Sequence, residues 1–192
     1  MKAPNFVATA LAVGLLGCAS SRPEAVSGTR DAALAVAESG RLGTQADDAE
    51  ALRAAVGRFL AALRTYSPEA MRASAGELYA GDAYFNDQIK ELRGAVAIRE
   101  YLARSAEALV EPVIRDEQVL IDDGHVVIRW SMSFRTEREP DRPPTVARGA
   151  SHLIFDRQGK VSFHEDFWDV TAAVWERIPV VGAVIRRVKG AF

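Results

Sequence analysis

The clearest pattern in the chain lies in residues 113–134, VIRDEQVLIDDGHVVIRWSMSF. Residues 126–134 alternate between apolar and more polar side chains, which is the period of a β-strand. Asp123-Gly124 is a strong signal for a hairpin turn, and the apolar run before it supplies a partner strand over residues 113–121. The stretch therefore predicts an antiparallel hairpin.

More strands follow this hairpin, and helices precede it. Two further strands are predicted at 146–155 and 161–169. Helical spacing of apolar residues predicts helices over 47–66, from Pro68 onward, over 95–109, and again over 172–188. A brief strand is expected at Tyr84-Phe85. Helices followed by four longer antiparallel strands indicate the α+β class. We expect N-terminal helices packed on a curved antiparallel sheet, a conical barrel that encloses a cavity.

The N-terminus predicts export. Met1-Lys2 and an apolar run over residues 6–16 fit a signal peptide of residues 1–17 and are too short to span a bilayer. The Leu-x-Gly-Cys pattern at Cys18 resembles the bacterial lipobox, which implies a lipoprotein acylated on that cysteine. By the same resemblance, Ala19 implies the outer membrane, facing the periplasm. A generic secretory signal, or a short buried helix with an incidental cysteine, are the alternatives.

The rest of the chain divides into a linker and one domain. Residues 18–46 have no sustained apolar stripe, so we expect the cysteine and a flexible tether there, although residues 32–38 could form a short helix; a single domain follows over 47–192. A net charge of -2 gives no sign of a nucleic-acid-binding face. The single cysteine rules out a disulfide within the chain.

Three short motifs point to a family. They are Tyr84-Phe85-Asn86-Asp87, Leu92-Arg93-Gly94 and His164-Glu165-Asp166-Phe167-Trp168-Asp169. In this order they resemble the nuclear transport factor 2-like superfamily, and the last one resembles its SnoaL-like and limonene epoxide hydrolase-like members. The resemblance covers residues 48–190.

The resemblance implies a set of candidate catalytic residues. Tyr84 and Asn86 match the pair that holds a water in epoxide hydrolases of this group, and Asp166 matches their acid on the last strand. The Arg-x-Asp of those enzymes is matched only by Arg129-Trp130-Ser131, so the second carboxylate is missing. Opening an epoxide with water needs both an acid and a base. This departure leaves the hydrolase assignment in doubt.

Strand alternation adds further candidates. His164 and Trp168 share the face of Asp166, so all three line the cavity if any one does. The other expected pocket residues are Tyr79, Asp87, Ser131 and His152. Each has a plainer alternative: Asp166 could pair with Arg129 across the sheet, His164 could be exposed, Asp87 could cap a turn, and the tryptophans could belong to the core.

Two functions remain open from the sequence. One is a membrane-anchored domain that binds a small apolar ligand in its pocket. The other is a pocket enzyme, an isomerase, cyclase or epoxide-type hydrolase, that uses Asp166 in general acid/base catalysis. The fold hosts both kinds of protein. We expect no metal or cofactor, because His125, His152 and His164 lie on different elements without ligand spacing. If Arg129 and Ser131 face the cavity, the apolar residues between them form an outer patch suited to a homodimer.

Overall fold

The computed structural model describes residues 23–45, 47–136 and 143–191. Its helices and strands follow one another as α1 (Pro23–Ser39), α2 (Asp48–Arg64), α3 (Pro68–Leu78), β1 (Tyr79–Asn86), β2 (Glu91–Arg93), α4 (Ala95–Glu107), β3 (Leu109–Asp122), β4 (His125–Thr136), β5 (Thr145–Phe155), β6 (Val161–Trp168), α5 (Val170–Ala173), the short 3-10 helix η1 (Trp175–Arg177) and α6 (Pro179–Lys189). The α+β class is confirmed. Cys18 and the predicted signal peptide lie outside the described residues.

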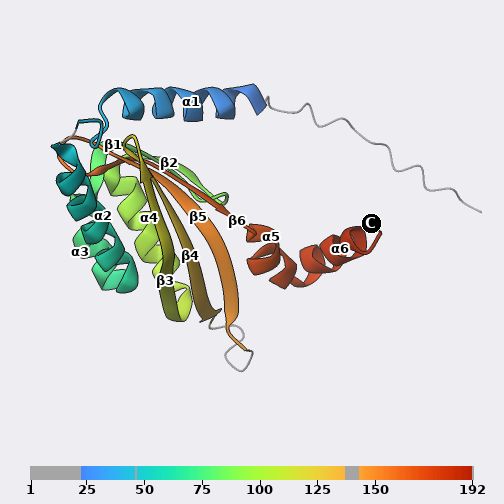
Figure 1. Ribbon diagram of the computed structural model, residues 1–192. Helices are drawn as coiled ribbons and strands as arrows, with labels where there is room; N and C mark the ends of the chain where they lie inside the picture. The colour runs from blue at the N-terminus through green and yellow to red at the C-terminus, as the bar shows by residue number, and fades with distance from the viewer. Residues whose placement is uncertain (1–22, 46, 137–142, 192) are drawn as a thin grey trace, which may run out of the picture.

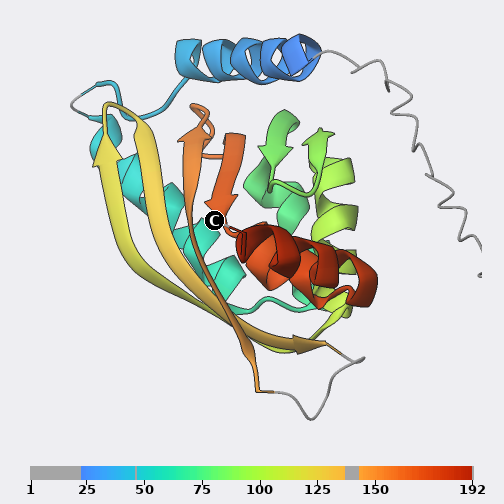
Figure 2. The same ribbon diagram turned by 90° about the vertical axis from the view of Figure 1, so that its right-hand side faces the viewer.

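The strands form one six-stranded sheet in the order β2-β1-β6-β5-β4-β3. It curves around helices α2, α3 and α4 without closing into a barrel (Figures 1 and 2). We call the face toward these helices the inner face and the opposite one the outer face. The four long strands are antiparallel neighbours as expected, but β1 is longer than Tyr84-Phe85 and pairs parallel to β6. The sheet is therefore mixed.

The main core lies between the inner face and helices α2 to α4. In α2 the buried residues recur every three or four positions: Leu52, Ala55, Val56, Phe59 and Leu60. This spacing places them on one side of the helix. Phe59 packs edge-on against Tyr79, Phe155 and His164, with ring centroids 5.6 to 6.3 Å apart. The core thus reaches the strands that carry the candidate site residues.

Helix α1 packs on the outer face, above β1, β5 and β6 (Figure 1). Ala33 and Ala37 are buried there against Tyr84, Ile154 and Phe163. The guanidinium of Arg30 holds the buried carboxylate of Glu165 through contacts of 2.7 to 3.1 Å. The segment expected to be a flexible tether thus contains a helix that packs on the sheet. Its small residues suit a linker, but they also let a helix lie close to a sheet.

The C-terminal elements return to the inner face at its far end. Ala173 of α5 packs with Phe134 and Ala147, next to Trp130 and Trp168. Gly149 makes this packing possible, because a Cβ there would lie 2.6 Å from the Trp130 ring and 2.8 Å from the carbonyl oxygen of Phe167. Among the described residues, no helix is both long and apolar enough to cross a membrane.

Candidate functional site

A buried chain of hydrogen bonds runs along the inner face. The Tyr79 hydroxyl lies 2.7 Å from His164 Nδ1, and His164 Nε2 lies 2.9 Å from Asp166 Oδ1. Ser151 donates to the same carboxylate oxygen at 2.5 Å and accepts from the Trp130 indole at 2.9 Å. The chain joins β1, β6, β5 and β4, so the curvature of the sheet brings its members together.

The direction of these hydrogen bonds can be assigned from the groups at the two ends. Burial, and then the negative charge of Asp166, raise the pKa of Tyr79 well above its usual value. Tyr79 therefore keeps its proton and donates to His164 Nδ1, which leaves Nε2 to donate to Asp166. The result is a carboxylate oxygen held by two donors, His164 and Ser151.

The second oxygen of Asp166 differs from the first. No described residue donates a hydrogen bond to Oδ2, whereas Oδ1 accepts both donors. The Asp166 side chain is 16% exposed, against 5% for His164. A partly buried carboxylate with one unused oxygen can accept a hydrogen bond or a proton from a molecule placed against the inner face.

Asp87 adds a second carboxylate near this chain. Its Oδ1 accepts the backbone N–H groups of Ile89 and Lys90, so it does cap the turn after β1. Its Oδ2 accepts the Tyr101 hydroxyl at 2.5 Å, and its carbonyl accepts the Trp168 indole at 2.7 Å. Burial and this hydrogen bond to Asp87 raise the pKa of Tyr101. Both oxygens of Asp87 are thus occupied, whereas Oδ2 of Asp166 accepts no hydrogen bond from a described residue.

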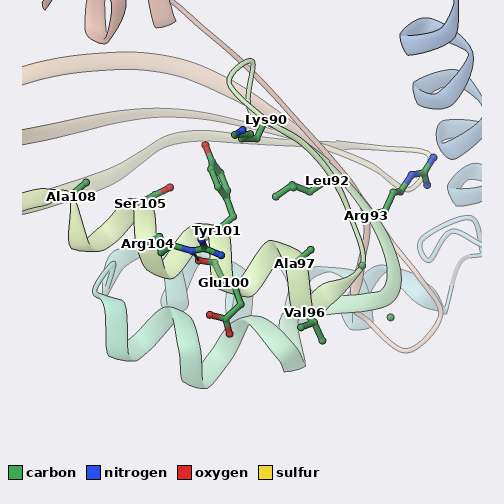
Figure 3. Close-up of a pocket in the computed structure, with 12 residues that line it drawn as sticks. Lys90, Leu92, Arg93, Val96, Ala97, Glu100, Tyr101, Arg104, Ser105 and Ala108 are labelled. Atoms are coloured by element: carbon green, nitrogen blue, oxygen red, sulfur yellow. Dashed lines mark hydrogen bonds between the residues drawn. The ribbon is translucent and has the colours of Figure 1, made fainter. Parts of the chain in front are cut away.

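An open groove of about 900 Å³ lies between β2 and α4 (Figure 3). Leu92, Val96 and Ala97 give it an apolar floor, and the ring of Tyr101 stands at its inner side. A smaller hollow of about 440 Å³ lies beside α2 and α3. Asp166 lines neither. The expectation that Asp166 opens onto a closed cavity is therefore not met by these two hollows.

Five expected site residues lie on the other face of the sheet. Tyr84 stacks on Phe163 under α1, with centroids 5.1 Å apart, and its hydroxyl meets the Asn86 amide. The remaining three belong to β4 and β5: Arg129, Ser131 and His152. The residues paired with them on the neighbouring strands also face outward. Ile128, Ser151 and Asp166, which are paired with one another across β4, β5 and β6, face inward.

These placements correct the set that the resemblance implied. Tyr84, Asn86 and Arg129 face outward and Asp166 faces inward, so they do not line one site. Successive residues of a strand point to opposite faces, and paired residues on neighbouring strands share a face. Arg129 instead meets Gln118 and Glu117 on the outer face. The alternative that Asp166 pairs with Arg129 is wrong for the same reason. The prediction that His164, Asp166 and Trp168 share a face is confirmed.

His152 has an outer-face environment of its own. Its Nε2 lies 2.9 Å from His125 Nδ1, and its ring packs near Phe163. Burial, and then the neighbouring His125, lower the pKa of His152. His152 therefore belongs to the contact between the sheet and α1 and not to the Asp166 site.

Sequence reasoning missed Ser151 and Tyr66. Ser151 is the second donor to Asp166 and links it to Trp130. Tyr66 lies between α2 and α3 and donates its hydroxyl to the Leu102 carbonyl, and burial, then Asp87 and Asp166, raise its pKa. No cluster of three or more possible metal ligands occurs within the described parts of the chain.

Comparisons with known proteins place the domain. No curated protein matches the sequence. Among solved structures, a protein of ketosteroid isomerase-like fold from Catenulispora acidiphila has 18% identity and a TM-score of 0.54 over 62% of this chain and 88% of its own. A putative SnoaL-like polyketide cyclase from Shewanella denitrificans has 20% identity and a TM-score of 0.52, covering 62% and 91%. An M. tuberculosis LEH-like epoxide hydrolase has 17% identity and a TM-score of 0.51, covering 65% and 86%.

At these identities the solved structures show a shared fold and nothing more. The sequence itself gives the family. The family model described as a SnoaL-like domain matches residues 56–164, which is more than half of the chain and includes β1 to β5 and the first half of β6, up to His164. The chain belongs to the SnoaL-like domain family.

Proposed function

We propose that the domain binds a small, mainly apolar molecule against the inner face of the sheet, with Asp166 as its polar contact. The observation that carries this proposal is the unused Oδ2 of Asp166, beside an Oδ1 that two protein donors already hold. Aromatic residues lie near that carboxylate: Tyr79 is linked to it through His164, Trp130 through Ser151, and Trp168 follows two residues later on β6. Such a wall favours an apolar ligand with one hydrogen-bond donor.

Placement of the remaining expected residues supports binding over epoxide hydrolysis. Tyr84, Asn86 and Arg129 lie on the outer face and cannot hold a water beside Asp166. Asp87, the other carboxylate on the inner side, has both oxygens engaged. The acid and the base that the attack of water on an epoxide requires are therefore not both supplied by these expected residues.

A second candidate is an acid/base enzyme that needs no water, such as an isomerase or cyclase. The observation that favours it is the His164–Asp166 hydrogen bond of 2.9 Å, backed by Tyr79. In this case Asp166 Oδ2 takes a proton from the bound molecule and returns it at another position, while His164 keeps the carboxylate oriented. Neighbours of the same fold are described as cyclases and as an epoxide hydrolase/cyclase-like enzyme.

The test is retention of a ligand by the purified full chain. Small molecules that co-purify with the wild type are released by denaturation and compared by mass spectrometry with those from Asp166→Asn. Asparagine keeps an oxygen for His164 and Ser151 but loses the charge, so we expect about tenfold less ligand, as for a lost hydrogen bond to a charged group.

Asp82→Asn is the matched control, because Asp82 is exposed on the same sheet. Equal amounts of ligand from all three proteins, or none from the wild type, would refute the binding proposal. Incubation of the recovered ligand with fresh wild type then separates the two candidates, since an enzyme converts it to an isomer and a binding protein returns it unchanged.

We further propose that Cys18 anchors the chain to the bacterial cell envelope, on the periplasmic side of the outer membrane. The support is the Leu-x-Gly-Cys pattern after an apolar run. Cys18→Ser should move the protein from the membrane fraction to the soluble fraction after a salt wash, and the wild type should carry acyl chains by mass spectrometry. A wild type without acyl chains would refute the anchor.

A further inference from the structure

Helix α6 presents its apolar side to solvent. Valines recur at every fourth position, and Val180, Val184 and Val188 are 77%, 59% and 53% exposed. Val181 beside them is 41% exposed. Residues four apart lie on one side of a helix. We call these four valines the valine stripe; it covers the length of an 11-residue helix, or about 16 Å.

The opposite side of α6 is fixed to η1. Gly182 lies so close to Glu176 that an added Cβ would be 2.0 Å from its carbonyl oxygen. The Arg186 guanidinium donates to that carbonyl at 3.0 Å, and the Lys189 ammonium lies 2.6 Å from the Glu176 carboxylate. These contacts set the rotation of the helix. The valine stripe cannot turn inward unless they break.

The valine stripe indicates an interaction surface, since exposed apolar residues gathered on one surface mark such sites. The charge on α6 indicates which partner. Its sequence, PVVGAVIRRVK, contains three basic residues and no acidic one. Arg186 and Lys189 lie on the side that holds Glu176, whereas Arg187 follows Val184 by three residues and Val180 by seven and so projects beside the valine stripe. An apolar stripe with a basic residue beside it, on a helix without acidic residues, suits an anionic lipid surface.

The position of α6 agrees with this partner. The first turn of α1 and helix α6 lie on the same side of the molecule, at the right in Figure 1 and toward the viewer in Figure 2. Four residues lie between Cys18 and Pro23, where α1 begins, so the two are five Cα–Cα steps apart. A chain of that length reaches at most about 18 Å. An acylated Cys18 therefore keeps this side of the domain near the membrane.

We propose that α6 is an interfacial helix that rests on an anionic lipid surface, with the valine stripe inserted among the headgroups. The positional part of the argument rests on the proposed anchor at Cys18, while the valine stripe and its charge do not. The helix fixes the orientation of the domain on the membrane, and the acyl anchor fixes only its distance.

The test uses the full chain with Cys18→Ser, so that no acyl chain contributes. Its binding is measured by co-sedimentation with vesicles of phosphatidylethanolamine and phosphatidylglycerol, and with phosphatidylcholine vesicles for comparison. Adding Val184→Glu and Val188→Glu should lower the partition coefficient on the anionic vesicles by about tenfold or more, because two apolar contacts become charged.

The matched control carries Val36→Glu and Val96→Glu, two valines of α1 and α4 that are 66% and 65% exposed. It adds the same charge elsewhere and should bind as the parent does; any contribution of the N-terminal residues is common to both proteins. Equal binding by the α6 variant and the control would overturn the proposal. So would a concentration-dependent dimer of the parent, without lipid, that the α6 substitutions dissociate, because the valine stripe would then join two copies. Neither result depends on whether Cys18 is acylated.

Discussion

Replacing Arg30 by alanine tests whether α1 is part of the folded domain. Arg30 contacts both carboxylate oxygens of Glu165, whose side chain is 7% exposed. Hydrogen bonding to Glu165 raises the pKa of Arg30, so the guanidinium keeps its charge. Without Arg30, the buried carboxylate of Glu165 loses its partner.

The cost can be estimated from the geometry. Removing one partner of a fully buried ion pair costs about 3–5 kcal/mol, but the Arg30 side chain is 31% exposed and water can replace part of its contact. We therefore expect Arg30→Ala to lower the free energy of unfolding by about 2 kcal/mol. If the free energy of unfolding falls by about 2 kcal/mol per M of urea, this loss lowers the urea midpoint by about 1 M.

Urea unfolding followed by circular dichroism measures this change, and Arg53→Ala on the exposed side of α2 is the control. Adding Glu165→Gln to Arg30→Ala should recover part of the loss, because the buried charge disappears. If Arg30→Ala is as stable as the control, α1 does not hold to the sheet, and residues 23–45 are the tether that the sequence predicted.

Two further changes probe the sheet. Gly149→Ala should cost about 2–3 kcal/mol by thermal unfolding, since the new Cβ meets Trp130 and the Phe167 carbonyl, whereas Gly81→Ala has open space and should cost little. The pKa of His152 is lowered in the folded state. At a pH between this lowered value and the unfolded value of 6.5, His152 is mostly neutral in the folded protein and mostly protonated in the unfolded chain. The stability that its neutral form contributes is present above the unfolded value of 6.5 and is lost as the pH falls through the folded pKa. His152→Gln should flatten this part of the pH profile; an unchanged profile, or a mutant with the steeper slope, would contradict the assignment.

Much of the fold follows from periodicity. The hairpin at Asp123-Gly124, the helical spacing of α2 and the common face of His164, Asp166 and Trp168 all depend on neighbours in sequence, and the structure confirms them. Local patterns decide such features because they fix which side chains lie together before any tertiary contact forms.

The site was harder to predict because it depends on pairing between strands. Alternation divides β4 into two sets of residues but does not say which set meets the core, and Arg129 was placed on the wrong side. The turn after Asp156 does predict the donor Ser151. Each step back along β5 pairs with one step forward along β6, so the register that pairs Ile154 with Phe163 also pairs Ser151 with Asp166. For α1, the sequence allowed a short helix over residues 32–38 but did not indicate that it packs on the sheet, because small residues suit a linker as well as a close contact.

The parallel pairing of β1 with β6 also governs when the site can form. Tyr79 and His164 are hydrogen-bonded although 85 positions separate them. Contacts so distant in sequence form late, because the intervening chain must first be brought into place at an entropic cost. While the chain is being synthesised, β1 has no β6 to pair with, and its edge stays open until the last strand arrives. A chain cut short before Val161 would keep helices α1 to α4 in its sequence but have an unprotected strand edge where the Asp166 site should be, and such edges promote aggregation.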